Sequence, residues 1–149
     1  MTQLDDIINH AESVCKDRGS RLTTKRKQIL SGLVLSKKAL SAYELIDYCK
    51  QEFDITVPAM SMYRILEFLE AESLVHKLSL ANKYVACSHI TCQHDHGVPQ
   101  FFICSNCNKV SEFSISQSTM AELQSCAQQA GYTLSSQQLE MNCLCNDCA

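Results

Sequence analysis

The chain has 149 residues, enough for one domain or for two small domains with thin hydrophobic cores. Its formal net charge is −3, and the charge is uneven, because residues 87–149 hold one basic residue, Lys109, against five acidic ones. No apolar run reaches membrane-spanning length, and residues 1–10 carry acids where a secretory signal carries basic residues, so we expect a cytoplasmic protein without a membrane partner.

Two helices are predicted in the N-terminal part of the chain. Apolar residues recur at helical spacing over residues 3–17, which indicates an amphipathic helix. Thr23 or Thr24 can cap a second helix, and residues 25–27 in its first turn are all basic. Cations at this end of a helix oppose its macrodipole. They form either an ordinary solvated surface or a contact with phosphate groups.

A helix-turn-helix followed by a wing is predicted next. Ser41 and Glu44 fit a capping box, which starts a third helix. A connector and a further apolar pattern predict a fourth helix, with Arg64 on its exposed side. Residues 74–78 and 83–86 have the pattern of two strands around a turn. This order is typical of winged-helix DNA-binding proteins, although another helical bundle would give the same helix pattern.

The distal part of the chain alternates strand and helix patterns. The order is strand, strand, helix, strand, at residues 101–104, 110–115, 118–130, and 132–134 with 139–141. It predicts a sheet with a free edge, and a free edge in so small a domain invites pairing with a second copy of the chain. We therefore expect a homodimer.

These patterns predict an α+β protein with two domains. Residues 1–86 form an N-terminal winged helix-turn-helix DNA-binding domain. Residues 87–99, which contain Gly97 and Pro99, form a hinge. Residues 100–149 form a small α/β dimerisation and metal-binding domain with an antiparallel sheet.

Two Cys-x-x-Cys pairs lie in the distal part. They are Cys104 with Cys107 and Cys145 with Cys148, separated by 37 residues that must contain a strand and a helix. Each pair can wrap a tight turn around one edge of a tetrahedral ion, so the spacing predicts a closed structural zinc site. The alternative is a pair of redox dithiols or disulfides, which a reducing cytosol disfavours.

Several stretches of the chain resemble the ferric uptake regulator family. The resemblance is carried by SAYEL, SMYRILEFLEAESLVHKL, YVAC, FFICSNC and the terminal CNDC, and it extends from about Leu22 to Cys148. It implies a homodimeric metalloregulator that binds double-stranded operator DNA when its sensing metal is present and represses metal-import genes. Such a protein is not an enzyme and has no small-molecule substrate.

The resemblance implies two zinc ions per subunit. Cys104, Cys107, Cys145 and Cys148 match the structural site. His76, Cys87, His96 and Glu112 match the sensing site, with His94 as the alternative to His96. A thiolate among imidazole and carboxylate ligands favours zinc, whereas an iron sensor is expected to use more oxygen and nitrogen ligands. An alternative for His76 is a surface histidine without a ligand role.

For DNA, Tyr43 and Arg64 match family positions that reach bases, and Tyr63 and Arg26 match positions near phosphates. If the Arg64 guanidinium made two hydrogen bonds to one guanine, it would favour that base over the other bases by about 1–3 kcal/mol. Tyr63 has the alternative of being part of the core. The family often has proline where Met60 stands in this chain.

Other functions are compatible with the same residues. An iron- or peroxide-sensing member of the same family is one alternative, and a zinc-ribbon adaptor or a thiol or zinc enzyme is another. A catalytic zinc keeps an open coordination position, and four protein ligands for each ion leave none. Cys92 and Cys143 are near the predicted sites and could substitute as ligands. Cys15, Cys49 and Cys126 are expected to be buried as small hydrophobic residues.

Overall fold

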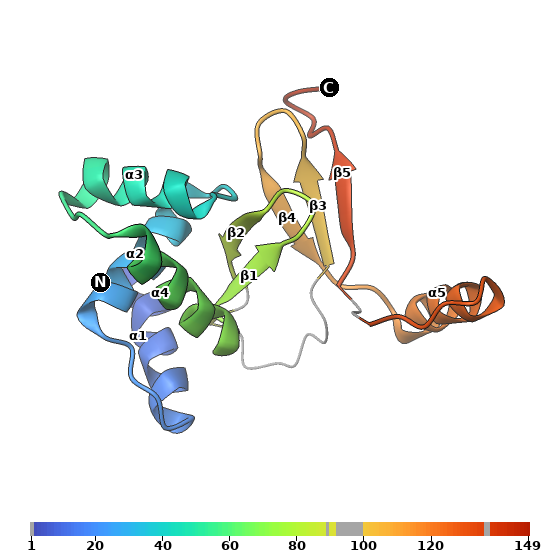
Figure 1. Ribbon diagram of the computed structural model, residues 1–149, viewed down its shortest axis with the longest axis horizontal. Helices are drawn as coiled ribbons and strands as arrows, with labels where there is room; N and C mark the ends of the chain where they lie inside the picture. The colour runs from blue at the N-terminus through green and yellow to red at the C-terminus, as the bar shows by residue number, and fades with distance from the viewer. Residues whose placement is uncertain (1, 89, 92–99, 136–137) are drawn as a thin grey trace. The chain divides into compact units, whose positions relative to one another are not determined.

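The computed structural model describes residues 2–88, 90–91, 100–135 and 138–149. The chain divides into two compact units, Met1–Gln93 and His94–Ala149. Four helices and a two-stranded sheet make up the first unit, and a three-stranded sheet and one helix make up the second (Figure 1). Within the described residues, no helix is both long and apolar enough to cross a bilayer. Cys92, His94 and His96 lie outside the described residues.

The helices of the first unit begin where the sequence offers a cap. They are α1 (Gln3–Asp17), α2 (Thr24–Ser36), α3 (Ala42–Phe53) and α4 (Ala59–Ala71). The hydroxyls of Thr2, Thr23 and Ser41 each accept a hydrogen bond from the backbone N–H three residues on. The capping box predicted at Ser41 and Glu44 is confirmed. Helix α4 has no side-chain cap and begins directly after Pro58.

Helices α2, α3 and α4 pack through their apolar faces. The shared core consists mainly of aliphatic side chains, namely Ile29, Leu30, Leu33, Leu45, Met62, Ile65, Leu66 and Leu69. At Gly32 the contact between α2 and α3 is so close that a Cβ atom would lie 3.3 Å from the Cys49 sulfur. Cys15 and Cys49 are buried, as predicted, but Cys126 is exposed, so the expectation for that thiol was wrong.

The wing consists of β1 (Val75–Leu78) and β2 (Lys83–Ala86), paired antiparallel with Val75 opposite Ala86. An isolated bridge between Leu40 and Tyr84, not predicted from the sequence, joins the segment before α3 to β2 through two backbone hydrogen bonds of 3.0 and 2.8 Å. The Lys83 ammonium lies 2.8 Å from a Glu44 carboxylate oxygen. The wing is therefore attached both to the segment just before α3 and to the first turn of α3.

The Glu44 carboxylate gives the first unit a pH-dependent contribution to stability. Its pKa is lowered by the hydrogen bond with Lys83 and by the backbone N–H of Ser41. Because the folded-state pKa lies below the ordinary value of 4.5, this stabilisation is complete above that value and is lost as the pH falls through the folded-state pKa. Glu44→Gln is expected to lower the free energy of unfolding by roughly 0.5–1 kcal/mol near neutral pH and by less in acid.

Urea unfolding followed by far-ultraviolet circular dichroism at several pH values would measure this difference. Glu52→Gln, an exposed glutamate of the same helix, is the matched control and should show little change. A deficit of Glu44→Gln that stays constant across the acid range would contradict an origin in the carboxylate charge.

The second unit contains β3 (Gln100–Cys104), β4 (Val110–Phe113), α5 (Gln117–Gln129) and β5 (Glu140–Cys143). Strand β3 is central and pairs antiparallel with β4, as predicted. It pairs in parallel with β5, so the sheet is mixed and not wholly antiparallel. The chain crosses over through α5 before β5 and therefore re-enters the sheet in the direction of β3. The strand predicted at 132–134 does not form.

Buried side chains are few in the second unit. Among its described residues, only Gln100, Phe101, Ile103 and Cys104 are buried, and all four lie on β3. Helix α5 begins at a Ser116 cap but buries none of its residues. A unit with so thin a core needs further stabilisation, from an ion or from a second copy of the chain.

Candidate metal centres and nucleic-acid interface

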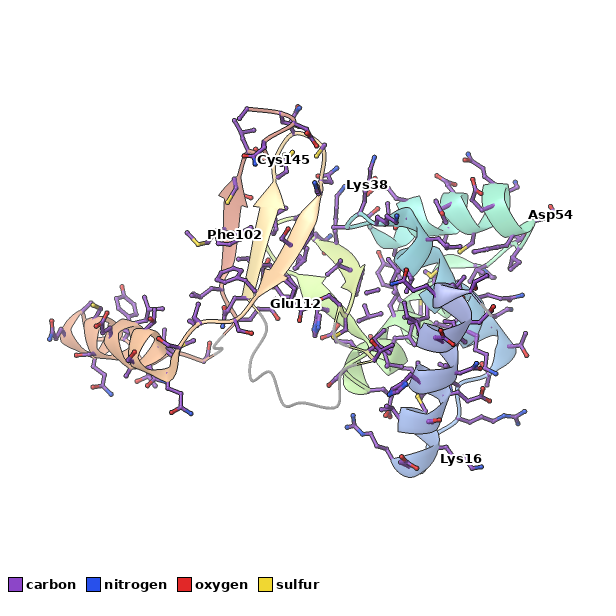
Figure 2. All side chains as sticks on the ribbon, turned by 180° about the vertical axis from the view of Figure 1, so that it is seen from behind. Lys16, Lys38, Asp54, Phe102, Glu112 and Cys145 are labelled. Atoms are coloured by element: carbon purple, nitrogen blue, oxygen red, sulfur yellow. The ribbon has the colours of Figure 1, made fainter. Side chains whose placement is uncertain are left out.

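Four cysteines meet at one end of the three-stranded sheet. Cys104 ends β3, Cys107 lies in the turn that follows it, and Cys145 and Cys148 come directly after β5. Because β3 and β5 run in parallel, with Cys104 opposite Cys143, both strands end at the same edge of the sheet. Figure 2 shows Cys145 beyond this edge, with sulfur atoms beside it. The sulfur atoms of the four cysteines all lie within 4.8 Å of one another.

The spacing of these four sulfur atoms fits a tetrahedral zinc ion. Zn–S bonds of about 2.3 Å define a tetrahedron with edges of about 3.8 Å. The sulfur atoms of Cys107 and Cys145 are 3.8 Å apart. The backbone N–H of Cys145 also points at the Cys104 sulfur, at 3.5 Å, as suits a thiolate. The cysteines of the described part of the chain are free thiols, which leaves these four available as ligands.

The electrostatics of this cysteine cluster favour a bound cation. Hydrogen bonds from the backbone N–H groups of Cys107 and Cys145 lower the pKa of Cys104 to about 6. At Cys148, a hydrogen bond with the Asn106 side chain lowers the pKa, but the neighbouring thiols and burial outweigh it and raise the pKa to about 11. Four thiols this close cannot all ionise without a compensating positive charge. A divalent cation supplies that charge.

The turn between β3 and β4 positions the first cysteine pair. Asn108 has φ +63°, in the left-handed region that asparagine tolerates better than most residues. Its N–H donates to the Cys104 carbonyl at 2.9 Å, and the Cys104 N–H donates to the Lys109 carbonyl at 2.8 Å. Cys143 does not belong to the cluster, since its sulfur contacts the Met141 carbonyl at 3.5 Å.

A second pair of side chains that could bind a metal ion lies on the wing. His76 is on β1, and Cys87 follows β2 and donates its N–H to the Leu74 carbonyl at 2.9 Å. The antiparallel pairing brings the two half-buried side chains together, with their ligand atoms within 4.8 Å of each other. Glu112 lies on β4 of the second unit, where Figure 2 labels it, and is half-buried. The predicted ligands His96 and His94 fall outside the described residues.

The predicted DNA-contacting residues of α3 and α4 are exposed. Tyr43, in the first turn of α3, is 64% exposed, and Tyr63 of α4 is 38% exposed. Arg64, next to Tyr63, is also exposed. Helix α4 is the second helix of the helix-turn-helix and directly precedes the wing, which makes it the recognition helix of this motif.

Arg26 has a structural role that sequence reasoning missed. Its guanidinium lies 3.7 Å above the centroid of the Phe68 ring, and its Nη1 donates to the Arg21 carbonyl at 2.7 Å. The stacking ties α2 to α4 through a cation–π contact. The phosphate contact that the resemblance implied for Arg26 stays a prediction. Nothing local in the sequence pairs Phe68 with Arg26, because the two residues lie on different helices.

Comparison with known proteins identifies the family. The model of the ferric uptake regulator family matches residues 17–142. The chain belongs to this family. It is 31% identical over 147 residues to the zinc uptake regulation protein of Escherichia coli (strain K12), covering 99% of this chain and 84% of that protein. It is 29% identical over 116 residues to the ferric uptake regulation protein of Helicobacter pylori (strain ATCC 700392 / 26695), covering 74% of this chain and 71% of that protein.

Solved structures of family members are similar along nearly the whole chain. A zinc uptake regulator complexed with zinc and DNA gives a TM-score of 0.82 at 28% identity, covering 99% of this chain and 96% of that one. The holo form of XcZur gives a TM-score of 0.74 at 32% identity, covering 95% of each chain. The winged-helix and α/β architecture is thus a known family fold, and the α+β class predicted from the sequence is confirmed.

Proposed function

We propose that the chain is a zinc-responsive transcriptional repressor that binds operator DNA of zinc-uptake genes as a zinc-loaded homodimer. The observation that carries this proposal is the similarity over 99% of the chain to a zinc uptake regulator complexed with zinc and DNA. The family is one of regulators, and the proposed activity is binding without catalysis. Because its target is operator DNA, we place the protein in the cytoplasm.

The first zinc ion is proposed to be structural. Cys104, Cys107, Cys145 and Cys148 would hold it and join the end of β5 to the turn after β3. This role is supported by the spacing of the four sulfur atoms and by the thin core of the second unit. Four thiolate ligands leave no open coordination position, as expected for a structural site.

The second zinc ion is proposed to be the sensed one. His76 and Cys87 would bind it from the wing, and Glu112 and His96, or His94 in place of His96, would complete the ligand set. Ligands from both units would then be fixed relative to each other only when the ion is bound. Without the ion, the ligands of the two units would no longer be held together, and the apparent DNA affinity would fall in proportion to the competent fraction.

The donor set favours zinc over iron as the sensed ion. Cys87 contributes a thiolate, a soft ligand that zinc accepts readily. An iron or peroxide sensor is the alternative within the family, since a ferric uptake regulation protein is among the relatives. Such a sensor is expected to rely on oxygen and nitrogen ligands and not to depend on Cys87.

The surface of the second unit supports a homodimer. Helix α5 buries none of its residues, and β4 and β5 are the edge strands of the sheet. Phe102, labelled in Figure 2, is exposed and stacks on Phe113 with ring centroids 4.0 Å apart. Met141 and Leu144 are also exposed apolar side chains of this unit. A second copy would cover such surfaces, and in a dimer two recognition helices can read half-sites about one DNA turn apart.

On DNA, α4 is proposed to lie in the major groove. Tyr43 and Arg64 would contact base edges, and Tyr63 and Arg26 would lie near phosphates. Arg26 would have to keep or exchange its contact with Phe68 to reach a phosphate. Because Arg26 belongs to α2 and its guanidinium stacks on Phe68 of α4, it would also help to orient the recognition helix.

A gel-shift titration tests the proposed function. The full-length protein is first loaded with zinc and used to select duplexes from a random-sequence pool, and the selected duplex serves as the operator. Operator affinity is expected to fall about 5–150-fold when a chelator strips the sensed ion, the range of an allosteric coupling of 1–3 kcal/mol. Equal affinity with zinc and with chelator would overturn the regulatory mechanism. Recovery of binding with ferrous iron but not with zinc would favour the iron-sensing alternative.

A further inference from the structure

A large apolar side chain is exposed at the start of the recognition helix. Met60 is the second residue of α4, and its exposed fraction is 68%. Positions 60, 63 and 64 lie three and four residues apart, so Met60 shares one helix face with Tyr63 and Arg64. The opposite face, with Met62, Ile65 and Leu66, is buried in the core of the first unit. Met60 therefore belongs to the face proposed to meet DNA.

The position of Met60 on the helix limits what it can contact. Residues at the N-terminal end of a recognition helix are those that approach base edges in the major groove. Single exposed apolar residues are common on protein surfaces, so exposure alone would mean little. At this position, however, a methionine offers neither a charge for phosphate nor a strong hydrogen-bond donor or acceptor for a polar base edge.

One base matches this chemistry. In the major groove, adenine, guanine and cytosine are recognised through their hydrogen-bonding groups, whereas thymine also presents a C5-methyl group. An unbranched, flexible methionine side chain can adapt to cover such a group. One apolar side chain is enough for this contact, because the thymine presents a single methyl group.

We propose that Met60 is a specificity-determining residue that recognises a thymine through its 5-methyl group, beside the base read by Arg64. This inference rests on the proposed function and deepens it, because it assigns one base preference to one side chain. Burying one methyl group corresponds to about 0.8 kcal/mol, which is about a fourfold change in affinity. In a symmetric dimer each half-site contributes separately, so the effect in both half-sites is about sixteenfold.

The test replaces single thymines of the selected operator with deoxyuridine, which lacks only the 5-methyl group. Affinities are measured by gel shift with zinc-loaded full-length protein and with its Met60→Ala variant. For the unaltered protein, replacing the contacted thymine in one half-site should give the fourfold loss of affinity. Replacing it in both half-sites should give the sixteenfold loss. For Met60→Ala, the same replacements should have no effect. Leu35→Ala, which truncates an exposed apolar residue near the C-terminal end of α2, should behave like the unaltered protein.

The outcomes separate this inference from the function on which it rests. The protein could bind its operator specifically and only with zinc, while every deoxyuridine replacement changes its affinity and that of Met60→Ala equally. That result would overturn the thymine contact and leave the repressor function in place. Selection that yields no preferred duplex would overturn both. Circular dichroism and zinc content of Met60→Ala should equal those of the unaltered protein, since the side chain is exposed and remote in sequence from every proposed ligand. A folding defect in the variant would itself contradict the assignment of Met60 to the solvent face.

Discussion

Replacing Cys145 with serine is expected to remove one zinc ion per chain and to unfold the second unit. The cysteine supplies one of four sulfur atoms that lie within 4.8 Å of one another, and it follows the strand that completes the sheet. Structural zinc contributes roughly 10–16 kcal/mol of apparent binding free energy in small zinc domains. The buried side chains of this unit, among the residues described, all lie on β3 and cannot replace a contribution of that size.

Zinc content and amide hydrogen exchange of the full-length protein would measure this effect. The variant should lose protection in β3, β4 and β5 while the helices α1 to α4 keep theirs. Cys143→Ser is the matched control, because Cys143 ends the strand that Cys145 follows but its sulfur is outside the cluster. Retention of both zinc and protection in Cys145→Ser and also in the double variant Cys143→Ser/Cys145→Ser would contradict the structural site. If only the double variant Cys143→Ser/Cys145→Ser loses zinc, Cys143 substitutes as a ligand.

Cys87→Ser is expected to weaken zinc-dependent operator binding by about 5–150-fold while leaving the structural zinc in place. Serine keeps the size of the side chain but offers a hydroxyl, which is a much poorer ligand for zinc than a thiolate. The variant should therefore lose the sensed ion and behave in zinc as the unaltered protein does in chelator. Gel shifts across a zinc titration, with zinc content measured on the same samples, would show both effects.

The exposed thiol of Cys126 on α5 provides the control for this prediction. Cys126→Ser should bind zinc and operator as the unaltered protein does, because the residue belongs to neither candidate site. An unchanged zinc response in Cys87→Ser would show that the Cys87 thiolate does not take part in sensing. It would leave the DNA-binding fold intact and would favour an iron-type sensor with oxygen and nitrogen ligands.

Local signals in the sequence were sufficient for most of the first unit. The spacing of apolar residues predicted the four helices, and Ser41 with Glu44 predicted a helix start that the structure confirms. Both signals act within a few residues along the chain, so they can be recognised without knowledge of the fold. The pairing of Leu40 with Tyr84 joins segments far apart in sequence and left no local pattern.

Longer-range features of the second unit were predicted less well. The parallel pairing of β3 with β5 depends on the crossover through α5, which strand propensity alone does not report. Residues 132–134 have a strand-like composition, but they precede the strand that enters the sheet, and they remain exposed. Cys126 was expected to be a core residue because of its type, whereas α5 buries none of its residues in the structure described.

The sequence by itself determined which residue types can bind metal and how they are paired, since two residues between cysteines suffice to form a turn around an ion. It also determined which helices form, because capping and amphipathic spacing are local properties of the chain. Only the tertiary structure decided that the two cysteine pairs meet, because their meeting requires β3 and β5 to run in parallel and end at the same edge of the sheet. It alone decided that Arg26 stacks on Phe68 and that Met60 faces solvent beside Arg64, because both follow from how α2 and α4 pack against the common core.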